Sequence, residues 1–103
     1  MKEFLNVING KSVPAKSGKT VKVYNPSTGQ VYASAPDSSI DDVNAAMKAA
    51  ADAFVLWKET TPSVRQRALL KIADAMEARI DEIVTIECEN TGKPISLTTT
   101  EEV

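Results

Sequence analysis

Residues 39–57 read SIDDVNAAMKAAADAFVLW, and this stretch decides the fold class that the sequence predicts. Its apolar side chains recur at steps of three and four residues, which places them on one face of a helix. The members of this stripe are Ile40, Val43, Met47, Ala50, Phe54 and Trp57. Ser39 and Asp42 have the spacing of a capping box, in which each residue satisfies a backbone N–H near the other. A helix over about 39–57 is therefore predicted.

A second helix is predicted over about 62–79. Thr61 suits the cap position, and Pro62 suits the first helical position, where a missing N–H costs nothing. A new apolar stripe follows, made of Ala68, Leu69, Ile72, Ala73, Met76 and Ile80. Because the connection between the two helices is short, we expect them to pack as an antiparallel pair.

A third, shorter helix is predicted over about 81–91. Gly92 suits the left-handed position that follows a helix, and Pro94 prevents the helix from continuing. Ser96 has the side chain of a cap for a further helix beyond them. The helical part of the chain thus consists of two long helices, a short one and the start of another.

The part before the helices, about residues 4–35, is predicted to form two β-hairpins. Asn9-Gly10 lies between two short apolar runs, and this dipeptide favours a type I′ hairpin turn. A second hairpin pairs roughly 20–24 with 30–35, because the apolar residues there alternate with polar ones. Pro26 and Gly29 suit the turn between those strands. The predicted class is α+β, with two hairpins preceding the helices.

Composition and charge narrow the possible functions. The 103 residues are 43% hydrophobic and 25% charged, which is typical of a globular protein, and the net charge of −2 offers no basic footprint for nucleic acid. No run of residues is apolar and long enough for a membrane span or a signal peptide, so a cytoplasmic protein is expected. Two apolar stripes of this size are expected to make the chain only marginally stable alone.

Catalytic chemistry has few candidates in this chain. It contains no histidine and a single cysteine, Cys88, which is flanked by Glu87 and Glu89 near the end of the third predicted helix. A reactive thiolate needs a neighbouring base or cation, or a helix N-terminus, and the sequence neighbours of Cys88 are acidic. A structural role is therefore predicted for Cys88, and no catalytic residue is assigned.

The order of the short motifs resembles the N-terminal segment of the NAD(P)-dependent aldehyde dehydrogenase superfamily. The resemblance covers residues 5–95. It rests on Val7 to Gly10, on Tyr24 to Val31, on the run from Asp41 to Trp57, on Arg65 to Asp74, and on Glu87 with Thr91 to Pro94. The runs Thr60–Arg65 and Asn90–Pro94 look most like the branch that acts on aminoaldehydes, such as γ-aminobutyraldehyde or betaine aldehyde.

The resemblance implies an activity and a fold. In this family a cysteine thiolate attacks the aldehyde, hydride passes to the nicotinamide of NAD or NADP, and a glutamate-activated water hydrolyses the thioester. Those groups and most of the coenzyme domain lie downstream of the segment that residues 1–103 resemble. The implied role of this chain is a single N-terminal segment of an α/β aldehyde dehydrogenase fold. It would pack on the rest of the enzyme chain and contribute to contacts in a homo-oligomer.

A metal site is also implied by the resemblance. Many members bind a monovalent cation through two carbonyls before the Asn-Pro turn and an acidic residue before Thr-Gly-Lys. The matching positions are Val23, Tyr24 and Asn90. Asn90 replaces the usual aspartate, and its amide oxygen can ligate a hard cation without supplying charge.

A second interpretation stays open at this point. The chain could be a non-enzymatic helical interaction module that is complete at 103 residues. Its partners would then be other proteins instead of a small-molecule aldehyde, whereas neither interpretation involves nucleic acid or a membrane.

Overall fold

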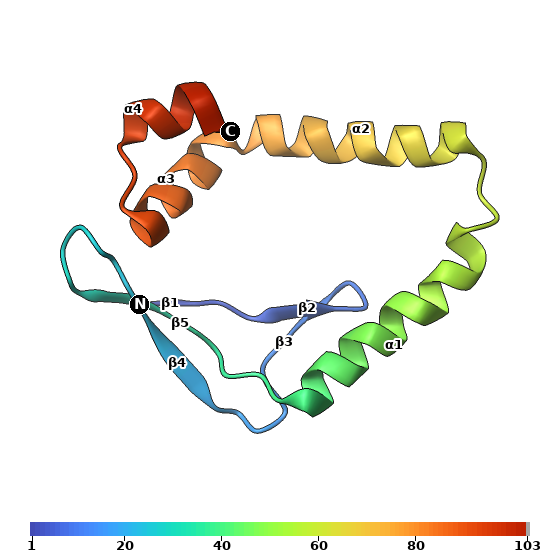
Figure 1. Ribbon diagram of the computed structural model, residues 1–103, viewed down its shortest axis with the longest axis horizontal. Helices are drawn as coiled ribbons and strands as arrows, with labels where there is room; N and C mark the ends of the chain where they lie inside the picture. The colour runs from blue at the N-terminus through green and yellow to red at the C-terminus, as the bar shows by residue number, and fades with distance from the viewer. Residues whose placement is uncertain (103) are drawn as a thin grey trace. The chain divides into compact units, whose positions relative to one another are not determined.

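The computed structural model describes residues 1–102, and these residues form two compact units. Residues 1–23 and 31–59 make the first unit, and residues 24–30 together with those from 60 onward make the second. Figure 1 labels the helices and strands along the chain. In order they are β1 (Lys2–Glu3), β2 (Asn6–Ile8), β3 (Lys11–Val13), β4 (Thr20–Tyr24), β5 (Val31–Pro36), α1 (Ile40–Trp57), α2 (Pro62–Ala78), α3 (Ile80–Thr91), α4 (Ile95–Leu97) and the π-helical turn η1 (Thr98–Glu102).

The first predicted hairpin is confirmed. Strands β2 and β3 are antiparallel, and Asn6 pairs with Val13 while Ile8 pairs with Lys11. Asn9 and Gly10 link them with φ angles of 54° and 73°, both in the left-handed region that a type I′ turn requires. The turn type was predictable because asparagine and glycine tolerate positive φ better than other residues.

The second predicted hairpin is confirmed as well, but it belongs to a larger sheet. The strand order is β1-β5-β4, and β1 runs parallel to β5 with Lys2 opposite Ala33. The backbone N–H of Phe4 donates to the Ser34 carbonyl at 2.8 Å and extends this pairing. Strand β1 was not predicted, because two residues are too few to show an alternating pattern.

Helix α1 begins where the capping box predicts, and its apolar surface is wider than the predicted stripe. The Ser39 N–H donates to the Asp42 carboxylate at 2.9 Å. Small residues, among them Ala46, Ala49 and Ala53, line a cleft against the β2–β3 hairpin. The bulkier members of the predicted stripe stay largely exposed: Ile40 is 70%, Met47 65% and Phe54 58% exposed. In the first unit, therefore, the hairpin lies beside the small residues of α1.

The remaining helices follow their predicted signals with two corrections. The Thr61 hydroxyl caps α2 by accepting from the Val64 N–H at 3.4 Å, and Gly92 ends α3 with a φ of 75°. Helix α3 begins at Ile80, directly after α2, one residue before the predicted start. The prediction that Ser96 caps a further helix is wrong. Pro94, with its φ of −62°, takes the cap position, and α4 starts at Ile95.

Little of the chain is buried. Among residues 1–100, the buried hydrophobic side chains are Ala15, Ala33 and Val84. Helix α2 buries none of its residues. The α+β class with hairpins before helices is confirmed, whereas the antiparallel packing of α1 on α2 stays a prediction because the two helices belong to different units.

Candidate functional site

The second unit contains a surface cleft where the turn after β4 meets the end of α3. Its volume is about 360 Å³. The lining residues are Asn25, Ser27, Cys88, Glu89, Gly92, Lys93, Pro94 and Ile95. The cleft therefore brings together the two motifs, Asn-Pro-Ser-Thr-Gly and Asn-Thr-Gly-Lys-Pro, which start 65 positions apart in the sequence.

Asn25 organises the turn side of this cleft. Its side-chain oxygen accepts from the Ser27 N–H at 2.9 Å, which forms an Asx turn, and its own N–H donates to the Gln30 carbonyl at 2.9 Å. The Gly29 N–H donates to the Asn25 carbonyl at 2.8 Å. These bonds hold a tight loop whose outer surface is presented to the end of α3.

Gly92 allows the helix end to approach the turn closely. A methyl group at its Cα would lie 3.1 Å from the Pro26 Cγ and 3.6 Å from the Ser27 Oγ. The residue also has the left-handed φ that terminates the helix, and its N–H donates to the Cys88 carbonyl at 2.9 Å. Glycine is thus required here for two reasons, of which the sequence pattern indicated only the helix end.

Cys88, which lines the cleft, also belongs to a hydrogen-bonded network. Its Sγ donates to the Thr98 Oγ1 at 3.4 Å, and that hydroxyl donates to the Pro94 carbonyl at 3.1 Å. Thr98 is completely buried. The thiol therefore links α3 to η1, the turn that begins at Thr98. This contact favours the structural role predicted for Cys88 over a nucleophilic one.

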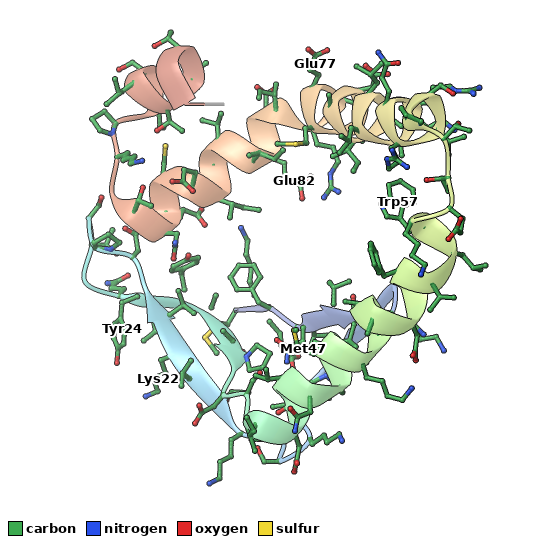
Figure 2. The ribbon with its side chains drawn as sticks, turned by 45° about the vertical axis from the view of Figure 1, so that its right-hand side comes forward. Lys22, Tyr24, Met47, Trp57, Glu77 and Glu82 are labelled. Carbon is green, nitrogen blue, oxygen red and sulfur yellow. The ribbon has the colours of Figure 1, made fainter. Side chains whose placement is uncertain are left out.

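The residues implied as cation ligands are divided between the two units. Val23 belongs to the first unit, and Tyr24 and Asn90 belong to the second. Tyr24 ends β4, and Figure 2 shows its side chain on the same side of the strand as that of Lys22. Two carbonyls and a neutral amide are hard oxygen donors that fit a monovalent cation. Within the part of the chain that the structure describes, no group of three or more His, Cys, Asp or Glu side chains could hold a metal ion.

Asp42 makes two backbone contacts, of which the sequence indicated only one. It is 4% exposed, and its Oδ1 accepts from the Lys16 N–H at 2.9 Å in addition to the capping contact. The backbone N–H of Ser39 and then that of Lys16 lower the pKa of the Asp42 carboxyl. The capping box indicated the first contact, whereas nothing in the sequence links positions 16 and 42.

Other charged groups form exposed pairs. Lys48 lies 2.7 Å from Asp52, and Arg79 lies 2.7 Å from Glu82. Each pair raises the pKa of its basic member, first through the hydrogen bond and then through the opposite charge. In the second unit, the Lys93 Nζ lies 3.7 Å from the Glu87 carboxylate, beside the cleft. Pairs as exposed as these contribute little to stability.

The chain is similar in sequence to a family of known enzymes. Residues 13–103 match the model of the aldehyde dehydrogenase family. The chain is 44% identical over 91 residues to 2-aminomuconic semialdehyde dehydrogenase of Danio rerio, a match that covers 88% of this chain and 18% of that protein. It is 44% identical over 89 residues to phenylacetaldehyde dehydrogenase of Pseudomonas fluorescens, which covers 84% of this chain and 18% of that one.

Solved structures show the same relationship. The NAD-dependent aldehyde dehydrogenase from Sinorhizobium meliloti superposes with a TM-score of 0.90 at 36% identity, over 96% of this chain and 20% of that one. PnpE in complex with nicotinamide adenine dinucleotide superposes with a TM-score of 0.93 at 34% identity, over 100% of this chain and 21% of that one. The fold is therefore that of the N-terminal region of a dehydrogenase. The chain belongs to the aldehyde dehydrogenase family, and it spans about a fifth of the length of these relatives.

Among the described residues, no helix is both long enough and apolar enough to cross a bilayer.

Proposed function

We propose that this chain is the N-terminal part of an enzyme that oxidises an aldehyde to the carboxylic acid with NAD or NADP. One observation carries the proposal: almost the whole chain superposes on about a fifth of full-length aldehyde dehydrogenases, with sequence identities of 34–36%. The catalytic cysteine and glutamate of such an enzyme belong to the remaining four-fifths. Cys88, whose thiol donates to the Thr98 hydroxyl, is not assigned as the catalytic cysteine.

Within that enzyme the chain acts as scaffold. Large apolar side chains on both long helices are exposed, including Phe54 on α1 and Leu69 on α2, at 58% and 65%. Exposed apolar surface of this extent marks an interaction site. We assign it to packing against the remainder of the enzyme chain and to contacts in a cytoplasmic homo-oligomer.

The coenzyme proposal follows the solved relatives. Two of them, PnpE and an aldehyde dehydrogenase from Bacillus cereus, were solved in complex with NAD. The proposed enzyme would hold NAD or NADP mainly through residues beyond this chain.

A monovalent cation is proposed at the carbonyls of Val23 and Tyr24 and the side chain of Asn90. Because Asn90 contributes no charge, binding should be weak. Replacing it with aspartate should lower the K⁺ concentration needed for half-maximal stabilisation of the full-length enzyme. An unchanged K⁺ dependence in Asn90→Asp would remove this residue from the site.

The substrate is proposed to be an aminoaldehyde, such as γ-aminobutyraldehyde or betaine aldehyde. The motifs Thr60–Arg65 and Asn90–Pro94 support this narrower assignment. The relatives at 44% identity carry other names, those of 2-aminomuconic semialdehyde and phenylacetaldehyde dehydrogenases. A panel of aliphatic, aromatic and amino aldehydes that includes these substrates, assayed by NADH or NADPH formation on the full-length product, distinguishes the assignments. Equal rates on aliphatic, aromatic and amino aldehydes would rule out the aminoaldehyde preference.

The experiment that tests the proposed function begins with the reading frame. We expect it to continue beyond codon 103 into a coenzyme-binding segment and a reactive cysteine, and its full product to reduce NAD or NADP in the presence of an aldehyde. A native stop codon after residue 103, with no separate chain that restores activity, would favour the helical interaction module instead.

A further inference from the structure

Three hydrogen bonds from earlier parts of the chain converge on the segment 37–42, which leads into α1. The Asn6 side chain donates to the Ser38 hydroxyl at 2.8 Å. The Asp37 N–H donates to the Lys19 carbonyl at 2.9 Å, and the Lys16 N–H donates to Asp42 at 2.9 Å. All of these residues belong to the first unit. The start of α1 is therefore the place where the hairpin, the loop after β3 and the strand β5 are joined.

Asp42 differs from the other members of this junction because it is a buried charge. Its two carboxylate oxygens have different partners. Oδ1 accepts from the Lys16 N–H, whereas Oδ2 accepts from the Ser39 N–H at 2.9 Å and from the Ser39 hydroxyl at 3.2 Å. An amide has one acceptor oxygen and could satisfy only one of the two backbone donors.

Apolar packing in this unit offers little to replace these bonds. Its buried hydrophobic residues are Ala15 and Ala33, which are 3% and 0% exposed. Ala15 directly precedes Lys16, so the contact with Asp42 also holds that buried methyl group in place. A backbone donor left without a partner in such a site carries the full cost of its desolvation.

We propose that Asp42 is an anionic clamp that makes the loop of residues 14–19 and the start of α1 open and close as one unit, and that protonation of its carboxylate releases both. The charged group that faces Asp42 from the loop is Lys16, whose ammonium adds a weaker attraction. The hairpin residues that line the adjacent cavity, Asn6, Val7 and Ile8, are uncharged. The clamp does not depend on the proposed enzymatic function.

The direction of the pH effect follows from the hydrogen bonds. They favour the ionised carboxylate, so the pKa of Asp42 in the folded chain lies below its ordinary value of 3.8. The stabilisation is fully present above that ordinary value, and it is lost as the pH falls through the lower folded pKa. The clamp is thus closed at neutral pH and opens in acid.

Hydrogen exchange of the full chain tests the clamp. It is followed residue by residue by NMR, with an osmolyte present and at a protein concentration low enough to limit association. In Asp42→Ala, the amides of Lys16 and Ser39 should both exchange about tenfold faster or more than in the wild type. Asp41→Ala is the matched control, because Asp41 is an exposed acidic residue in the same first turn. This substitution also removes one negative charge from the helix start, but it leaves the hydrogen bond from the Lys16 N–H in place. The exchange rate of the Lys16 amide should therefore change less than about twofold.

Two results would overturn the proposal: equal effects of the two substitutions, or a Lys16 amide that keeps its protection in Asp42→Ala. If Asp42→Ala does not fold, the wild type is measured from pH 6 downward, with intrinsic exchange rates taken into account. Protection at Lys16 and Ser39 should then be lost over the same pH range. Loss at two clearly different pH values would show two independent contacts and no clamp.

Discussion

Replacement of Gly92 by alanine should destabilise the second unit for two reasons that can be separated. The φ of 75° at this position is left-handed, and an L-residue there costs about 1–2 kcal/mol. The new Cβ would lie 3.1 Å from the Pro26 Cγ, well inside the ~3.5–4.0 Å that two carbon atoms prefer. Overpacking costs ~1–3 kcal/mol in a well-packed core, and about 1 kcal/mol is expected here because Gly92 and Pro26 are both exposed.

Gly29 provides the matched control for the backbone contribution. Its φ is 71°, and a Cβ built there has no atom within 4 Å. Gly29→Ala should therefore cost only the left-handed strain, about 1–2 kcal/mol. The difference between the two substitutions, about 1 kcal/mol, isolates the contact between the end of α3 and the turn that contains Pro26.

Urea unfolding followed by circular dichroism at 222 nm measures both losses, with an osmolyte present to raise the baseline stability of the chain. A difference of 1 kcal/mol corresponds to roughly 4–8 °C in Tm for a domain of this size. Pro26→Ala removes the Cγ and should recover part of the loss in the Gly92→Ala background but not in the Gly29→Ala background. Equal destabilisation by the two glycine substitutions, within about 0.5 kcal/mol, would refute the close contact.

Three further outcomes are expected. The chain alone should self-associate or melt broadly, and Phe54→Glu on the exposed face of α1 should reduce the association measured by sedimentation; a monodisperse wild-type monomer with a sharp transition above about 65 °C would contradict this. Acid unfolding of the first unit should begin below the ordinary aspartate pKa in the wild type. Asp42→Asn should lower the stability of the unit already at pH 7 and flatten its dependence on pH. If the stability of Asp42→Asn falls with pH in parallel with that of the wild type, other carboxyls cause the transition. Lys48→Ala should leave the Tm unchanged within error, because the Lys48–Asp52 pair is exposed, and a clear salt-sensitive loss would show that the pair matters.

Elements that depend on near neighbours in the chain were predictable. The hairpin turn at Asn9-Gly10, the capping box of Ser39 and Asp42, and the helix end at Gly92 each follow from the conformational preferences of two to four residues. The order of these motifs also indicated the aldehyde dehydrogenase family, which the comparisons confirmed. The prediction failed at Ser96, because Pro94 takes the cap position and the helix starts two residues earlier than a serine cap at position 96 would place it.

Contacts between distant residues were decided only by the tertiary structure. The sequence showed that α1 has an apolar stripe, but not that the β2–β3 hairpin would pack against the neighbouring alanine face. It assigned Gly92 to a helix end, and the structure added its approach to Pro26. It assigned Asp42 to a cap, and the structure added the Lys16 N–H, 26 positions away. Local preferences act through covalent neighbours and so are written in short stretches of sequence, whereas these contacts exist only once the chain has brought separate segments together.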